Sequence, residues 1–240
     1  MKIEGKNSVR ELLKSGKTID KVLVANGMRD AESKSLVNII KSSGVKVSYA
    51  DKSILDKESE TRRHQGFIAY VSDYKYCELG DILNNVKDKE DAFIVVLDGI
   101  EDPHNLGSII RVAECGGLDG IIIGKRRSAA VTDAVMRISE GGANHVKIAR
   151  VTNVNAAIDE LKENGVWVYG LELGGQDIYK TDLRGRIALV VGGEDTGINK
   201  LTQKKCDAVV SMKMYGKINS LNASVACGVA VFEALRQRSL

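Results

Sequence analysis

Residues 212–224, MKMYGKINSLNAS, join an apolar strand to a long helix near the end of the chain. The loop brings Ser220, Asn222 and Ser224 to the start of that helix, where hydroxyl and amide side chains stand beside backbone N–H groups that have no partner within the helix. Such a loop can hold a polar ligand. Because an ordinary capped helix would look the same, the loop indicates a site only if other segments meet it.

The composition is that of a globular protein. The 240 residues are 43% hydrophobic and 28% charged, and the net charge of +3 permits a polyanionic partner without requiring one. The sequence has neither a membrane-spanning apolar run nor a signal-peptide pattern at its N-terminus, so we expect a cytoplasmic protein. The four scattered cysteines form no CxxC pair and, like the histidines, are expected to bind no metal; they are expected to be buried free thiols.

The hydrophobic pattern predicts two α/β domains joined by a linker. Residues 1–74 alternate short strands and helices, and the more polar residues 75–90 are interpreted as a linker that includes a helix over 79–86. In residues 91–240, apolar strands alternate with helices, which is typical of a parallel sheet covered on both faces. The strands expected there are 92–97, 120–123, 146–149, 166–171, 187–191 and 208–210.

The loop after the strand 92–97 carries the first candidate functional residues. Its sequence, DGIEDPHNLGSIIR, covers residues 98–111. Asn105 is a plausible N-cap for a helix over 106–115, with Pro103 rigidifying its approach, and Arg111 could reach back toward the helix start. Ligands bind at the carboxyl ends of the strands in such sheets, although a capped helix with a surface arginine would show the same pattern.

The loop after the strand 187–191 carries the second set. In GGEDTG, residues 192–197, Gly192 and Gly193 allow the backbone to approach a ligand closely. The pattern is neither GxGxxG nor a phosphate-gripping Walker loop. Glu194 could contact a ribose, a nucleophile or a subunit partner, or could cap the next helix. Since the three loops follow three strands, we expect them to form one site.

In this order the three motifs resemble those of the SpoU (TrmH, or SPOUT) family of RNA ribose 2′-O-methyltransferases over residues 92–238. The likeness is greatest to the branch that methylates a guanosine of 23S ribosomal RNA. EGKNSV, residues 4–9, and HQG, residues 64–66, resemble that family's small N-terminal α/β domain, which binds RNA. The resemblance implies a deep trefoil knot in the C-terminal α/β domain, S-adenosylmethionine bound in the knot, and a homodimer.

The resemblance also implies roles for individual residues. Because a guanidinium stays protonated, we expect Arg111 to grip the target phosphate and to stabilise developing negative charge rather than to act as a base. The other expected catalytic residues are Asn105, Glu194, Ser220 and Asn222. The residues expected to hold the cofactor are Gly192, Gly193, Gly197, Met212, Met214, Leu221 and Asn222.

Three positions depart from the family pattern. Asp195 stands where glycine is frequent, Lys213 replaces a common proline, and Ala223 replaces a common valine. The first two could alter the loop backbone near the cofactor, whereas the small Ala223 is expected to be harmless.

Two basic clusters are candidate RNA contacts, because lysine and arginine neutralise phosphates. One consists of Arg62, Arg63 and His64, and the other of Lys125, Arg126 and Arg127, which follow the strand 120–123. A solvated charged loop explains the first cluster equally well.

Other functions stay open at this point. The alternatives are a transfer RNA ribose methyltransferase, a non-catalytic RNA-binding protein of the same fold, and an ordinary nucleotide-cofactor enzyme. The complete set of motif residues argues against a non-catalytic protein, and the lack of GxGxxG after a strand argues against the nucleotide-cofactor enzyme.

Overall fold

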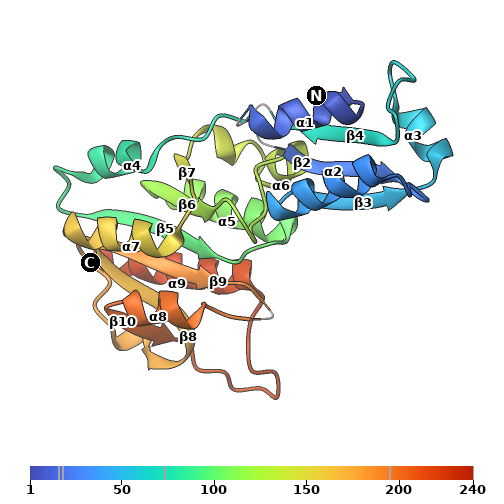
Figure 1. The fold of residues 1–240 in the computed structure, drawn as a ribbon. Helices are drawn as coiled ribbons and strands as arrows, with labels where there is room; N and C mark the ends of the chain where they lie inside the picture. Colours follow the sequence, from blue (N-terminus) through green and yellow to red (C-terminus); the bar gives the residue numbers. More distant parts are fainter. Residues whose placement is uncertain (16, 18, 73, 195, 240) are drawn as a thin grey trace. The chain divides into compact units, whose positions relative to one another are not determined.

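The computed structural model describes residues 1–239 except Gly16, Thr18, Asp73 and Asp195. The chain divides into two compact units, Met1–Lys75 and Tyr76–Leu240 (Figure 1). Within the described part of the chain, no helix has both the length and the apolar character needed to cross a membrane.

The first unit contains a four-stranded mixed sheet in the order β1-β4-β2-β3. Its strands are β1 (Lys2–Glu4), β2 (Ile19–Ala25), β3 (Lys46–Ala50) and β4 (Phe67–Val71), and its helices are α1 (Lys6–Lys14), α2 (Ala31–Ser42) and α3 (Lys52–Glu58). Helices α1 and α2 pack Val9, Leu36 and Ile40 against one face of the sheet, whereas α3 packs Leu55 against the other. The sequence pattern missed β1, because three residues form a strand only through their pairing with β4.

The second unit contains a six-stranded sheet in the order β10-β8-β9-β5-β6-β7, and every neighbouring pair in it is parallel. Its strands are β5 (Ala92–Asp98), β6 (Gly120–Gly124), β7 (Ile148–Val151), β8 (Trp167–Asp177), β9 (Arg186–Gly192) and β10 (Ala208–Ser211). Its helices are α4 (Leu79–Val86), α5 (Pro103–Cys115), α6 (Asp133–Ile138), α7 (Val154–Glu163), α8 (Lys200–Lys205) and α9 (Ala223–Arg238), with short 3₁₀ turns at Gly142–Asn144 and Ile178–Lys180. The predicted parallel α/β sheet is confirmed.

Helices cover both faces of this sheet. Ile82 of α4 and Ile158 of α7 pack with Ile94 and Val190 in one core on the first face. On the other face, Arg238 of α9 lies 4.9 Å from the ring centroid of Phe93. Alternate residues of the central strands therefore face different helices, as the continuous apolar runs indicate.

Three details differ from the sequence-based expectations. Helix α5 begins at Pro103, and its N-cap is Asp102, whose carboxylate accepts a hydrogen bond from the backbone N–H of His104; the assignment of Asn105 as N-cap was wrong. All four cysteines are free, but only Cys227 is buried; Cys77 and Cys206 are partly buried and Cys115 is exposed. Residues Tyr76 to Val86, part of the segment interpreted as a linker, belong to the second unit, where α4 joins the core.

Strand β8 continues to Asp177, well beyond the expected end at residue 171. Its polar, glycine-rich second half is held by β10, which pairs Val210 with Gln176. Gly175 permits this pairing, because a Cβ atom there would lie 2.5 Å from the carbonyl oxygen of Val209. The trefoil knot implied by the resemblance stays a prediction, since strand order does not trace how the chain is threaded.

Candidate active site

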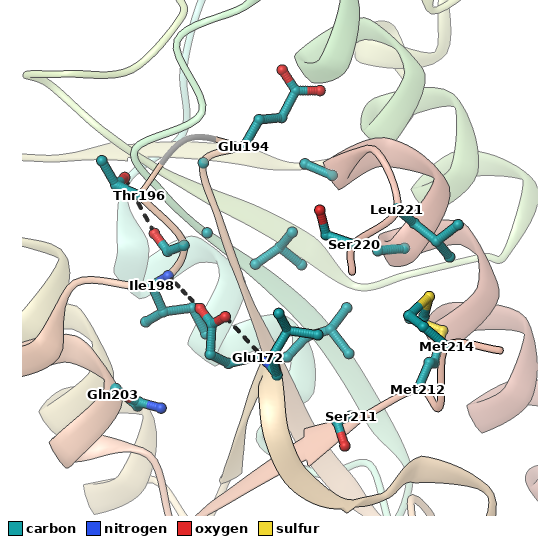
Figure 2. Close-up of a pocket in the computed structure, with 18 of the residues that line it drawn as sticks. Glu172, Glu194, Thr196, Ile198, Gln203, Ser211, Met212, Met214, Ser220 and Leu221 are labelled. Atoms are coloured by element: carbon teal, nitrogen blue, oxygen red, sulfur yellow. Dashed lines mark hydrogen bonds between the residues drawn. The ribbon is translucent and has the colours of Figure 1, made fainter. Parts of the chain in front are cut away.

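The loops expected to form a site lie together at the carboxyl edge of the parallel sheet. The last residues of β5 and β9, Asp98 and Gly192, are paired, and β10 ends at Ser211 two strands away. The loops that follow β9 and β10 enclose a cavity of about 490 Å³ (Figure 2). The cavity is lined by Leu171, Glu172, Leu173, Val191, Gly192, Gly193, Glu194, Thr196, Gly197, Ile198, Lys200, Gln203, Ser211, Met212, Met214, Ser220, Leu221, Ala223 and Ala226.

The loop after β9 folds back on itself, and its glycines make this possible. The N–H of Gly193 donates to the carbonyl of Asp98 over 3.1 Å, and the N–H of Gly197 donates to the carbonyl of Gly193 over 2.8 Å. A Cβ atom on Gly192 would lie 2.1 Å from the carbonyl carbon of Gly197. This side of the cavity is therefore a wall of tightly packed backbone that tolerates no side chain at Gly192.

Glu172 of β8 holds the loop after β9 by a hydrogen bond and was not identified from the sequence. Its Oε2 accepts a hydrogen bond from the backbone N–H of Ile198 over 2.8 Å, and its Oε1 accepts one from the N–H of Leu173 over 3.1 Å (Figure 2). A Cβ atom on Gly197, whose φ is +62°, would lie 2.3 Å from Oε2. The carboxylate and the loop thus fit each other closely. The local pattern could not indicate this interaction, because it ended the strand at residue 171.

Asn222 connects the three motifs. It is the N-cap of α9, and its Oδ1 accepts hydrogen bonds from the N–H groups of Ser224 and Val225 over 3.0 and 3.3 Å. Its Nδ2 donates to Oδ1 of Asn105 over 2.9 Å and also to Oε1 of Glu194. Asn105 in the first turn of α5, Glu194 in the loop after β9 and Asn222 at the end of the loop after β10 are here called the three-loop cluster. They meet although they follow three different strands.

A second, smaller cavity adjoins the three-loop cluster. It measures about 280 Å³ and is lined by Gly99, Ile100, Glu101, Asp102, Asn105, Gly193, Glu194 and Thr196. Gly193, Glu194 and Thr196 line both cavities, so the two cavities are neighbours. The arrangement can hold two ligands side by side.

Arg111 lies apart from both cavities. Its Nη1 donates to Oε1 of Glu140 over 2.7 Å, and the two side chains are 52% and 68% exposed. The structure thus brings together Asn105, Glu194 and Asn222 but places Arg111 farther along α5, in an exposed ion pair.

The remaining expected cofactor residues are at the large cavity. Met212, Met214 and Leu221 line it, as do Gly192, Gly193 and Gly197, and so does Ser220, which was expected to be catalytic. The ammonium of Lys213 lies 5.1 Å from the ring centroid of Tyr215, and Ala223 also lines the cavity. Asp195 lies outside the described residues.

Two thiols of the second unit have a raised pKa. Burial raises the pKa of Cys227 to about 12, and burial followed by the nearby Asp207 raises the pKa of Cys206 to about 11. Neither thiol supplies a thiolate near neutral pH. Among the described residues, no group of three or more His, Cys, Asp or Glu side chains could hold a metal ion.

The basic residues fall into two kinds of environment. Lys125, Arg126 and Arg127 are exposed directly after β6, which pairs in parallel with β5, so they lie at the same edge of the sheet as the cavities. In the first unit, Arg62 and Arg63 are exposed, but His64 is only 4% exposed.

His64 is enclosed by its own unit. Its Nε2 lies 2.9 Å from Oδ1 of Asp56, and its Nδ1 accepts a hydrogen bond from the N–H of Gly66 over 3.0 Å. Nearby, the carboxylate of Glu4 accepts hydrogen bonds from the Ser59 hydroxyl and the Glu60 N–H, both over 2.6 Å. These interactions hold the loop that presents the two arginines to solvent.

Two family models match the chain, one for each unit. Residues 92–232 match the SpoU rRNA Methylase family, and residues 2–77 match the domain described as RNA 2′-O ribose methyltransferase substrate binding. A Bacillus subtilis protein with the provisional name TrmH family tRNA/rRNA methyltransferase YacO is 38% identical over 237 residues, which cover 98% of this chain and 95% of the relative. A Staphylococcus haemolyticus protein of the same provisional family name is 40% identical over 240 residues, covering 98% and 95%.

Solved structures share the fold. The SpoU methyltransferase AviRb from Streptomyces viridochromogenes, in complex with the cofactor AdoMet, matches with a TM-score of 0.64 and 23% identity, covering 100% of this chain and 90% of that one. An AdoMet-bound rRNA methyltransferase from Sinorhizobium meliloti matches with a TM-score of 0.63 and 24% identity, covering 98% and 86%.

Proposed function

The chain belongs to the SpoU rRNA methylase family, and on that premise we propose that it methylates the 2′-hydroxyl of a guanosine ribose in 23S ribosomal RNA, with S-adenosylmethionine as methyl donor. The ribose 2′-hydroxyl as target is supported by the substrate-binding domain matched over residues 2–77. The choice of 23S RNA and of guanosine is supported by the motif resemblance alone. The names of the relatives include transfer RNA, so a transfer RNA substrate is the second candidate.

The large cavity fits S-adenosylmethionine. Its volume of about 490 Å³ falls within the range of about 300–1,000 Å³ that is typical of sites for small-molecule ligands. Met212, Met214 and Leu221 supply apolar surface, the β9 loop supplies backbone, and the carboxylates of Glu172 and Glu194 suit a ligand with positive charge. When bound, the cofactor supplies a methyl group already activated by its sulfonium charge.

The three-loop cluster would then position the ribose. The smaller cavity lies beside the cofactor cavity and shares Glu194 with it. A ribose placed there would have its hydroxyl beside the carboxylate of Glu194, which accepts hydrogen bonds, and beside the amide of Asn105. As the new O–CH₃ bond forms and the S–CH₃ bond breaks, the hydroxyl proton leaves to phosphate, water or a nearby carboxylate. Alignment of the two reactants can supply about 7 kcal/mol or more in favourable cases.

Arg111 would bind a phosphate of the RNA. Its present partner is Glu140, and an exposed ion pair of this kind contributes only about 0–1 kcal/mol. A phosphate, which arginine can bind through two parallel hydrogen bonds, can therefore take the place of the glutamate. Lys125, Arg126 and Arg127 at the same sheet edge, and Arg62 and Arg63 in the first unit, would hold further phosphates.

We also propose that the chain works as a homodimer formed through α9, with the C-terminal segment threaded as a trefoil knot. Val225, Val229 and Phe232 are 51%, 36% and 52% exposed and recur at spacings of four and three residues, so they share one face of the helix. An exposed apolar stripe of this kind favours a protein partner. Helix α9 packs against α5, the helix that carries Arg111, so a partner subunit docked there would lie near that arginine.

The meeting of Asn105, Glu194 and Asn222 beside two adjoining cavities is the observation that carries the proposal. The test is transfer of tritiated methyl groups from S-adenosylmethionine to total RNA from a strain that lacks this protein. Digestion to nucleosides should release the label as 2′-O-methylguanosine from the large ribosomal RNA. Label in transfer RNA would favour the second candidate, and the absence of label from all RNA would contradict the proposed activity.

A further inference from the structure

A pocket of about 250 Å³ lies in the first unit, between α2 and the edge strand β3. It is here called the tyrosine pocket and is lined by Val24, Ala25, Gly27, Met28, Ser33, Lys34, Val37, Asn38, Lys41 and Tyr49. These residues take no part in the methyl-transfer site. Every lining residue is neutral or basic, and all of them belong to the described part of the chain.

Tyr49 is the most informative of these residues. It is 54% exposed on the edge strand β3. Val37 and Met28, which are partly buried against the core, provide apolar surface beside it. The ammonium of Lys41 lies 5.8 Å from the ring centroid, near the outer limit of about 6 Å for attraction to an aromatic face. An open aromatic ring with a cation at its side is the arrangement that proteins use to stack a base and hold its phosphate.

The pocket adjoins the loop that carries Arg62 and Arg63. A Cβ atom on Gly66, which follows that loop, would lie 2.8 Å from Cε of Met28, so the methionine rests directly against the glycine. Gly66 has a φ of +83°, a conformation that favours glycine. The tyrosine pocket and the end of the loop that carries Arg62 and Arg63 therefore meet where Met28 packs against Gly66.

We propose that the tyrosine pocket binds a single unstacked nucleobase of the RNA, stacked on Tyr49, while Lys34 and Lys41 bind the flanking phosphates. The pocket is smaller than the sites of about 300 Å³ or more that hold drug-sized ligands, and this size suits one ring system. Sequence-specific RNA recognition mostly targets single-stranded loops and bulges whose bases can be turned outward. This proposal rests on the proposed function, because it takes RNA as the substrate. A pocket of this kind would make the first unit bind single-stranded RNA in preference to duplex RNA.

The test uses the full chain and a 12-nucleotide oligouridylate that carries one central 2-aminopurine, whose fluorescence changes when the base stacks. With Tyr49→Leu, which keeps apolar bulk but removes the ring, we expect affinity to fall about 5- to 150-fold, the range for removal of one base–aromatic stack. Tyr49→Phe should bind within about twofold of the wild type, because phenylalanine keeps the stacking face. In the Lys34→Ala/Lys41→Ala variant, two phosphates are no longer neutralised, so the slope of log affinity against log salt should decrease by about 1.4, at about 0.7 for each single-strand phosphate.

Tyr179→Leu is the matched control, because Tyr179 is also 54% exposed but lies in the second unit. It should leave oligonucleotide binding unchanged. Equal binding by the wild type and Tyr49→Leu, including no binding by either, would overturn the proposal, as would a preference for a blunt duplex of the same length. Methyl transfer is measured separately. If the wild type is active and Tyr49→Leu binds the oligonucleotide normally, only the proposed role of the tyrosine pocket is refuted. If the wild type is inactive but the fluorescence change depends on Tyr49, only the proposed methyltransferase activity is refuted.

Discussion

The side-chain amide of Asn222 donates a hydrogen bond to Oδ1 of Asn105 over 2.9 Å, although 117 residues separate them in the sequence. Asn105 is only 4% exposed whereas Asn222 is exposed, so this partly buried hydrogen bond joins the loop before α9 to the first turn of α5. The same amide group donates to Glu194. A change at Asn222 should therefore affect the positions of all three loops.

Asn222→Ala should lower both stability and turnover. Removal of an asparagine N-cap costs about 0.5–2 kcal/mol of stability, and the variant also lacks the hydrogen bonds to Asn105 and Glu194. Asn222→Ser separates the two effects, because serine caps a helix well but cannot bridge the other two loops. We expect its melting temperature to recover while kcat stays low; recovery of kcat together with stability would mean that Asn222 acts only as a cap.

Glu172→Gln should weaken cofactor binding. The glutamine keeps the size of the side chain but has only one oxygen to accept the N–H groups of Ile198 and Leu173. A hydrogen bond to a charged group contributes about 1.5–3 kcal/mol, so the Kd for S-adenosylmethionine measured by calorimetry should rise at least about 10-fold. Glu163→Gln, at the exposed end of α7, is the matched control and should bind normally. An unchanged Kd for Glu172→Gln would show that the β9 loop does not depend on this carboxylate.

Arg111→Ala should abolish most turnover while leaving the melting temperature nearly unchanged. Its guanidinium is paired with Glu140, and an exposed ion pair of this kind contributes about 0–1 kcal/mol. Glu140→Gln removes that pair from the other side and should retain activity. Parallel decreases of melting temperature and activity in Arg111→Ala, or an equal decrease of activity in Glu140→Gln, would indicate a structural role for the pair.

Phe232→Glu should convert a dimer into monomers. It places a charge in the apolar stripe of α9, and a buried unpaired charge opposes association strongly. Light scattering coupled to size-exclusion chromatography should show the mass falling from about twice the 26.0 kDa chain to one chain. Leu173→Glu, at a residue with the same 52% exposure on β8, would show whether any added surface charge has this effect. A wild-type protein that is already monomeric would contradict the proposed dimer.

Much of the second unit follows from local patterns. The apolar runs around Ile94 and Val190 predicted central strands, and α4 has the bounds that its periodicity indicated. The meeting of Asn105, Glu194 and Asn222 could be expected because parallel strands end at one edge of the sheet. Local pattern and topology therefore agree for this part of the site.

The features that were missed depend on interactions between distant segments. Glu172 lies in the second half of β8, between the residues that pair with β10, and its Oε2 accepts a hydrogen bond from Ile198, in a loop more than twenty residues away. The N-cap of α5 is Asp102 rather than the expected Asn105, because Pro103 is well suited to the first helical position. Asn105 instead accepts a hydrogen bond from Asn222. His64, a candidate RNA contact, is enclosed by Asp56 and the turn at Gly66. Single-sequence patterns carry no information on such partners.

Ribose methylation can be compared along ribosomal and transfer RNA from cells with and without this protein, read as resistance of individual linkages to alkaline cleavage. We expect one guanosine linkage of 23S RNA to lose its resistance when the protein is absent and to regain it with the wild-type chain but not with Asn222→Ser. Identical cleavage profiles in both strains would contradict the claim that these three loops hold a methyl donor beside an RNA sugar.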